Sequence, residues 1–184
     1  MRIAISGPPG SGKTTVSEMV AERLGYELVL VGQIFRQMAS ERGVDLETFG
    51  RFAEEDETID RELDDRMVAV AASRNDIVIE GRLTGALLRR KGIEAFTVHI
   101  DASEEVRCLR IAKRECDEDD AIMKETRMRE RSERKRYLAY YGVDPSNRMI
   151  YDLWIDSSTR TAEEVAEEVV AEAKKRCDLE AQKG

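Results

Sequence analysis

The stretch Gly7-Pro8-Pro9-Gly10-Ser11-Gly12-Lys13-Thr14 decides how the rest of the chain is organised. It matches the pattern G-x-x-x-x-G-K-[ST] at every fixed position. The apolar residues 2–6 before it predict a strand, and residues 13–24 predict a helix after it. Glycines let the backbone curl until successive N–H groups converge on an anion, and the helix N-terminus adds its dipole. The stretch therefore predicts a phosphate-binding loop, residues 7–14, for a nucleoside triphosphate.

Individual positions of this phosphate-binding loop have expected roles. Lys13 is expected to reach the β- and γ-phosphates and to act in catalysis, and the Thr14 hydroxyl to bind Mg²⁺. Glu80, at the end of a later apolar run, is expected to hold the same Mg²⁺ through water. The residues expected to contact ATP are Gly7, Pro8, Pro9, Gly10, Ser11, Gly12, Lys13, Thr14 and Thr15. The alternative is a glycine-rich turn that binds nothing.

Short apolar runs alternate with longer helical stretches along the chain. The runs are rich in Ile and Val at successive residues, as in strands covered on both faces. The expected strands are 2–6, 26–31, 76–80, 95–100 and 149–155. The expected helices are 13–24, 33–42, 46–73, 84–91, 103–115, 121–141 and 161–177, and Thr161 with Glu164 forms a capping box for the last. The alternation predicts an α/β fold with a doubly wound, five-stranded parallel sheet.

Two helical segments are longer than one crossover between strands requires. Residues 32–75 contain no convincing strand, and residues 103–141 form a second long helical excursion. We expect a single domain, 1–184, with a helical insertion at about 33–74 and a helical lid at about 114–134.

Composition excludes several other classes of protein. The chain has 184 residues, of which 41% are hydrophobic and 37% charged, as in a helix-rich globular domain. A net charge of −8 argues against a nucleic-acid coat protein or a polybasic membrane binder. No apolar run approaches about 20 residues, and the N-terminus does not resemble a signal peptide. Cys108, Cys116 and Cys177 lack the spacing of a zinc or redox motif. We expect a cytoplasmic monomer that binds neither nucleic acid nor membrane.

Arginines follow two of the expected strands, at the edge where a doubly wound sheet binds its ligands. Arg36 lies in Gly32-Gln33-Ile34-Phe35-Arg36 after the second strand, and Arg82 in Glu80-Gly81-Arg82 after the third. Guanidinium groups bind phosphate through paired hydrogen bonds, and Gly81 permits close approach. We expect Arg36, Gly81 and Arg82 to hold an acceptor phosphate. The alternatives are a solvated helix residue for Arg36 and a strand-end ion pair for Arg82.

The second excursion carries two arginine stripes. Residues spaced by three, four and seven positions share one helix face. The stripes are Arg107, Arg110 and Arg114, followed by Arg127, Arg131 and Arg134. Converging arginines suit a lid that closes over phosphates and neutralises charge during transfer, so the second stripe is expected to be catalytic. The alternatives are solvated faces with pairs such as Glu130–Arg134, or an RNA-binding helix.

Two acidic residues and the single histidine complete the candidates. Asp56 and Asp60 share one face of the expected helix 46–73 and are candidates for binding a ribose or a base amino group; an exposed acidic helix is the alternative. His99 lies in the fourth strand and is expected to be a packed core residue. A phosphate acceptor has a second pKa of about 6, so it is already a competent nucleophile and needs no general base. A hydroxyl acceptor would call for a carboxylate base.

The phosphate-binding loop does not by itself define the reaction. The N-K-x-D and D-x-x-G strings of small GTPases are absent, and the chain is short for a motor or transporter ATPase. The remaining class is mainly the small P-loop kinases, which phosphorylate a nucleotide or another metabolite.

Within this class the chain resembles the cytidylate kinases, most closely their short archaeal type. The resemblance rests on Gly-Pro-Pro-Gly-Ser-Gly-Lys-Thr, Gly-Gln-Ile-Phe-Arg, Glu-Gly-Arg and the segments 53–56, 129–137 and 140–144. It implies a core sheet, a nucleoside-monophosphate-binding insertion, a lid, and Mg²⁺-dependent transfer from ATP to CMP or dCMP. By motif, Arg36 matches the arginine that holds the CMP phosphate, Arg82 matches the arginine of the Asp/Glu-Gly-Arg element, and Arg131 matches the start of the lid signature.

The chain departs from the bacterial members at specific positions. Ser132 and Lys135 stand where their lid signature has Asp, and Leu83 stands where they have Asp after Gly-Arg. Ribose and base contacts therefore do not carry over from the bacterial type. Adenylate kinases show Asp-Gly-Phe-Pro-Arg after the third strand, thymidylate kinases show Asp-Arg, and shikimate kinases show a glycine triplet, none of which occurs there.

Three hypotheses follow from the sequence. The first is a kinase that converts CMP and dCMP to CDP and dCDP with ATP and Mg²⁺. The second is a P-loop kinase for AMP or for a small metabolite hydroxyl. The third is a non-catalytic nucleotide- or RNA-binding module.

Overall fold

The computed structural model describes residues 1–115 and 120–181 and contains a five-stranded parallel sheet. The strands are β1 (Arg2–Ser6), β2 (Glu27–Leu30), β3 (Ile77–Glu80), β4 (Phe96–Asp101) and β5 (Leu153–Asp156). They lie in the order β2-β3-β1-β4-β5, and every neighbouring pair is parallel. The predicted α/β class with a doubly wound parallel sheet is confirmed. All carboxyl ends of the strands meet at one edge, which is where such sheets bind ligands.

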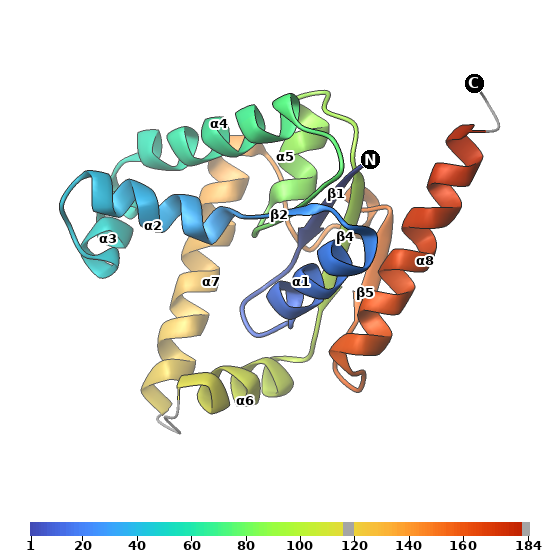
Figure 1. The fold of residues 1–184 in the computed structure, drawn as a ribbon. Coiled ribbons are helices and arrows are strands. Elements are labelled where there is room, and N and C mark those ends of the chain that lie inside the picture. The colour runs from blue at the N-terminus through green and yellow to red at the C-terminus, as the bar shows by residue number, and fades with distance from the viewer. Residues whose placement is uncertain (116–119, 182–184) are drawn as a thin grey trace.

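Helices cover both faces of the sheet (Figure 1). They are α1 (Lys13–Leu24), α2 (Val31–Glu41), α3 (Leu46–Glu55), α4 (Glu57–Ser73), α5 (Thr84–Arg90), α6 (Glu104–Glu115), α7 (Asp120–Tyr141) and α8 (Ala162–Ala181). Successive strand side chains point to opposite faces. Ile3 and Ile5 therefore pack into one core with α1 and α8, whereas Ala4 packs into another with α4 and α5. The apolar runs without alternation reflect this burial on both faces.

Several boundaries differ from the sequence expectation. The expected helix 46–73 is two helices, because Asp56 adopts an extended backbone and its carboxylate accepts a hydrogen bond from the Thr58 N–H at 2.9 Å. The expected strand 149–155 begins only at Leu153, after a 3₁₀ turn at Arg148–Ile150. The second strand ends at Leu30, and α2 starts at once.

The capping box predicted for the last helix is present. The Thr161 N–H donates to the Glu164 carboxylate at 2.8 Å, and the Glu164 N–H donates to the Thr161 hydroxyl at 3.2 Å. These reciprocal bonds satisfy donors that the first turn of α8 leaves without helical partners.

Helices α2, α3 and α4 fill the connection between β2 and β3 and have a small core of their own. It is formed by Met38, Ala39, Phe49, Ala53 and Ile59. Phe49 is fully buried, and its ring centroid lies 4.7 Å from that of Phe35. This satellite core explains how the insertion keeps its shape while projecting from the sheet.

Helices α6 and α7 fill the connection between β4 and β5. Residues 116–119, which include Cys116 and part of the expected lid, lie outside the described residues. The C-terminal half of α7 returns to the insertion, where the Tyr141 hydroxyl donates to Asp64 of α4. Burial raises the pKa of Asp64 to about 7. The two excursions from the sheet thus meet each other.

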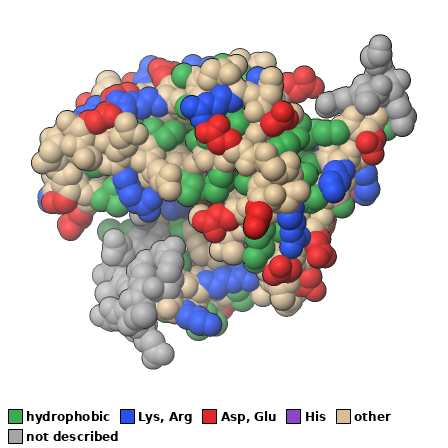
Figure 2. Space-filling model, in the orientation of Figure 1, with side chains coloured by type: hydrophobic (Ala, Val, Ile, Leu, Met, Phe, Trp, Pro, Cys, Tyr) green, Lys and Arg blue, Asp and Glu red, His purple; other side chains and the backbone are tan. Residues whose placement is uncertain are grey.

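The surface mixes charges of both signs over the face drawn in Figure 2. Within residues 1–115 and 120–181, no helix combines the length and apolar character needed to cross a membrane.

Removal of the Phe49 ring tests the satellite core. Phe49→Ala should lower the free energy of unfolding by about 3–5 kcal/mol, because a fully buried aromatic ring is lost and a cavity remains. Urea unfolding followed by circular dichroism measures the change. Phe52→Ala, on the same helix but 44% exposed, is the matched control and should cost less than about 1 kcal/mol. Equal effects of the two variants would contradict this core.

Candidate active site

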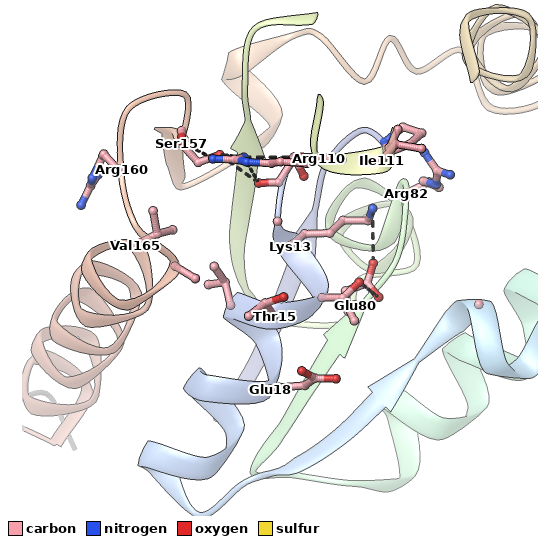
Figure 3. Close-up of a pocket in the computed structure, with 18 of the residues that line it drawn as sticks. Lys13, Thr15, Glu18, Glu80, Arg82, Arg110, Ile111, Ser157, Arg160 and Val165 are labelled. Carbon is pink, nitrogen blue, oxygen red and sulfur yellow. Dashed lines mark hydrogen bonds and ion pairs between the residues drawn. The ribbon is translucent and has the colours of Figure 1, made fainter. Parts of the chain in front are cut away.

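A pocket with a volume of about 820 Å³ lies at the carboxyl edge of the sheet, against the phosphate-binding loop (Figure 3). One wall is the loop with the first turn of α1. A second wall comes from α2 and the end of β3, and a third from α6 and the β5–α8 connection. Its polar and charged side chains include Lys13, Thr14, Arg36, Glu80, Arg82, Arg110, Ser157 and Arg160. The topology therefore brings residues far apart in sequence into one cavity.

The conformation of the loop depends on its glycines. Gly10 has φ of +76°, and a Cβ atom there would lie 2.5 Å from the Arg107 carbonyl oxygen. At Gly7, with φ of +155°, a Cβ atom would lie 2.2 Å from the Ile100 carbonyl oxygen. L-residues are disfavoured at such φ values, and no side chain fits these spaces. The backbone is thereby pressed against β4 and α6, with helix α1 starting at Lys13.

Lys13 is nearly buried at the centre of the pocket, with 8% of its surface exposed. Its ammonium lies 3.7 Å from a Glu80 carboxylate oxygen and donates to the Pro8 carbonyl at 3.2 Å. Figure 3 shows the two side chains pointing toward each other. Burial, helped by the positive charge of Arg82, lowers the pKa of Lys13 to about 8, although Glu80 and Glu133 oppose the shift. An incoming anion would stabilise the charged form.

Thr14 and Glu80 place two hard oxygen donors side by side. The Thr14 hydroxyl donates to Glu80 at 3.3 Å. Among the described residues, no three His, Cys, Asp or Glu side chains gather as ligands for a metal ion. A hydroxyl and one carboxylate suit Mg²⁺, which takes its remaining ligands from phosphates and water.

Arg36 and Arg82 face the same pocket from two neighbouring strand ends. Arg36 extends from α2 and is exposed. Arg82 lies one residue beyond Gly81, at which a Cβ atom would approach the Thr84 hydroxyl to 2.5 Å. Arg82 also forms an ion pair with Glu133 of α7 at 3.5 Å. The space beside these arginines therefore already accommodates negative charge.

The arginine stripe predicted on α7 is exposed to solvent, and Arg134 also lines a smaller pocket next to Glu133 and Tyr137. Arg127 pairs with Glu104, Arg134 lies 2.6 Å from Asp144, and all three stripe residues, including Arg131, are exposed. None of the three lines the large pocket.

The inward face of α7 carries Glu133, Arg136 and Tyr137. Arg136 lies 2.8 Å from Asp60 of the insertion, and Glu133 meets Arg82. Sequence reasoning missed this face because it chose the functional face of the helix by the spacing of its arginines alone. The signal available was the spacing of Tyr137 and Tyr141, which both pack against the core beneath α4 and α5.

Asp56 and Asp60 have different surroundings. Asp56 is exposed and caps α4, and the hydrogen bonds from Thr58 lower its pKa. Asp60 is buried, and its pKa is raised by that burial although Arg136 opposes the shift. The helix break at Asp56 separates the two carboxylates, so they do not form one continuous face.

The third wall of the pocket contains Arg110, from the first predicted arginine stripe, and Ser157, which sequence reasoning did not assign. The Arg110 guanidinium donates to the Ser157 hydroxyl at 3.0 Å and to the Ser157 carbonyl at 2.7 Å. Beside it lie the aliphatic side chains of Ile111 and Val165. Arg110 belongs to the first predicted stripe, and the Arg114 side chain lies outside the described part of the chain. The available signal for Ser157 was its place directly after the fifth strand.

His99 does not line this large pocket, but it lines a smaller one together with Pro8, Pro9 and Arg82. It is 4% exposed and stacks on Trp154, with ring centroids 3.9 Å apart. Burial lowers the pKa of His99 to about 4, so the ring is neutral near pH 7. The expectation of a packed core histidine agrees with this burial.

Comparisons with known proteins agree with the motifs. The model of the "Cytidylate kinase-like family" matches residues 2–159. A cytidylate kinase from Archaeoglobus fulgidus is 44% identical over 167 residues, which cover 91% of each chain. One from Methanocaldococcus jannaschii is 44% identical over 86% of this chain and 89% of its own.

A solved structure shares the fold at lower sequence identity. Shikimate kinase from Acinetobacter baumannii, in complex with shikimate, superposes with a TM-score of 0.64 at 19% identity, over 95% of this chain and 93% of its own. The family match, the identity to archaeal relatives over most of both chains and the phosphate-binding loop lead to one assignment: the chain belongs to the cytidylate kinase-like family.

Proposed function

We propose that the protein transfers the γ-phosphoryl group of ATP to CMP and dCMP, giving CDP and dCDP. One observation carries this proposal. A single pocket holds the phosphate-binding loop with Lys13 on one wall and the paired arginines Arg36 and Arg82 on the next. The relatives named cytidylate kinase support the choice of acceptor.

The donor occupies the loop side of the pocket. The loop N–H groups and Lys13 hold the phosphates, while Thr14 binds Mg²⁺ and Glu80 orders its water. When bound, Mg²⁺ offsets the charge on the phosphates. The flat Arg110 guanidinium beside Ile111 offers an apolar and cationic surface for the adenine ring.

The acceptor phosphate lies between Arg36 and Arg82, next to Lys13. A phosphate oxygen is already nucleophilic near pH 7, so the residues need only position it and neutralise charge. It would replace the Glu133 carboxylate as a partner of Arg82. This exchange keeps a negatively charged group beside the arginine in both states.

The nucleoside of the acceptor is expected to extend toward the insertion, residues 33–74. On that side the buried carboxylate of Asp60 pairs with Arg136 of α7, and Asp56 supports this wall by capping α4. The lid, residues 114–134, would bring Arg127, Arg131 and Arg134 toward the phosphates only after α6 and α7 move inward. Such closure excludes water from the transferring group.

The identity of the acceptor has a direct test. A coupled assay of ADP release should show turnover with CMP and dCMP, and much weaker turnover with UMP, AMP, GMP and dTMP. Shikimate and gluconate extend the panel to hydroxyl acceptors. Turnover with another acceptor but not with cytidine nucleotides would overturn the specificity, and tight ATP binding without any turnover would overturn the enzyme.

Substitution of Arg36 should impair binding of the acceptor, whereas substitution of Lys13 should impair the transfer step. Arg36→Ala should raise the KM for CMP roughly 10–100-fold, since charge-assisted hydrogen bonds to a phosphate are lost, and should leave the KM for ATP unchanged. Lys13→Ala should abolish transfer. Arg51→Ala, an exposed arginine of the same insertion, is the control and should match the wild type. Unchanged CMP kinetics for Arg36→Ala would place the acceptor elsewhere.

The titration of Lys13 predicts a pH dependence of ATP binding. In the protein without ligand, the pKa of Lys13 is about 8. The ammonium that attracts phosphate is therefore present below that pH and is lost above it. The affinity for ATP, measured by calorimetry, should fall about tenfold between pH about 7.5 and pH about 9. Lys13→Arg keeps its charge, so its affinity should stay constant over this range. A wild-type affinity that does not change with pH would contradict the low pKa.

A further inference from the structure

Arg107 of α6 joins three separate parts of the molecule through one planar side chain. Its Nε donates to the Ala102 carbonyl at the end of β4 at 3.1 Å, and its Nη1 donates to the Pro9 carbonyl at 3.2 Å. The other side of the guanidinium faces Glu130 of α7, with a bond from Nη1 to Oε1 and one from Nη2 to Oε2 at 3.4 Å. Only 11% of the Arg107 side chain is exposed.

The bond to Pro9 fixes the direction of a peptide group. A peptide is planar and trans, so its C=O and N–H point to opposite sides. Arg107 bonds the Pro9 carbonyl but does not line the large pocket, so we take the carbonyl to point away from that pocket. The N–H of Gly10, in the same peptide, therefore points to the inside, where the phosphates bind. The Arg107 backbone also packs closely on Gly10, which fixes the position of α6 against the phosphate-binding loop.

Glu130 sets the position of Arg107 in turn. Two carboxylate oxygens against two guanidinium nitrogens fix both the distance and the plane of the pair. Since Glu130 lies on α7, the orientation of the loop peptide depends on where α7 lies. A second pair, Arg127 with Glu104, joins the same two helices but lies on the surface and away from the loop.

We propose that Arg107 is a positioning residue that orients the Gly10 N–H toward the phosphates. Glu130 makes this orientation depend on the position of α7. The inference rests on the proposed phosphoryl transfer but not on which acceptor is used. It differs from the expectation that the first arginine stripe contacts phosphate, because Arg107 acts from the outer side of the loop.

Kinetics of the full-length protein test the proposal. Arg107→Ala should lower kcat about 100-fold, the effect of misplacing a catalytic group slightly, with little change in the KM for CMP. Arg107→Lys should recover part of this loss, because one ammonium reaches either Pro9 or Glu130 but not both in a plane. Glu130→Ala should lower kcat about tenfold, and should have no further effect when Arg107 is already Ala.

Glu104→Ala is the matched control, because it breaks the surface pair between the same helices. It should leave kcat unchanged. If Glu104→Ala lowered kcat as much as Glu130→Ala, the packing of α6 on α7 would matter and the link to Pro9 would not. Additive effects of the Arg107 and Glu130 substitutions would show that Glu130 acts independently, which also contradicts the proposal.

A spectroscopic measurement separates this proposal from the identity of the reaction. In protein labelled with ¹⁵N-glycine, saturating Mg–ADP should shift the Gly10 amide resonance strongly in the wild type and in Glu104→Ala. The shift should be much smaller in Arg107→Ala, while melting temperatures confirm that each variant is folded. An equal shift in Arg107→Ala would overturn the proposal even if the enzyme used another acceptor, and absence of turnover in the wild type would leave this readout intact.

Discussion

Positive charge gathered at one edge of the sheet is the constraint on which the rest of the site depends. Burial of Lys13, followed by the nearby positive charge of Arg82, lowers the pKa of the Lys13 ammonium. Glu80 and Glu133 offset these charges and thereby stabilise the folded chain without a ligand. A substrate phosphate can take over the role of the Glu133 carboxylate beside Arg82.

The sheet topology makes this gathering possible. Parallel strands end at the same edge, so residues that follow β1, β2, β3 and β5 meet although they are far apart in sequence. The net charge of −8 describes the whole chain, whereas the pocket is lined by several arginines and a lysine. The overall charge and the charge of the site thus differ in sign, and the site is the one relevant to anionic substrates.

The parts that sequence predicted well are those set by local patterns. The phosphate-binding loop is encoded in eight consecutive residues, and doubly buried strands are apolar without alternation. The parts it missed depend on packing between distant segments. Asp56 interrupts a helical pattern by capping α4, and the inward face of α7 is chosen by Tyr137 and Tyr141 rather than by its arginines. Arg110 and Ser157 meet only because α6 and the β5–α8 connection fold to the same edge.

The account requires that Arg36 and Arg82 bind the phosphate group of the acceptor. The most direct measurement is a calorimetric titration of CMP and of cytidine into protein saturated with Mg²⁺ and a non-hydrolysable ATP analogue. The two ligands share the base and the ribose and differ only in the phosphate. CMP should bind at least about 100-fold more tightly, because its phosphate engages guanidinium groups in a partly buried pocket. Equal affinities for CMP and cytidine would contradict the account.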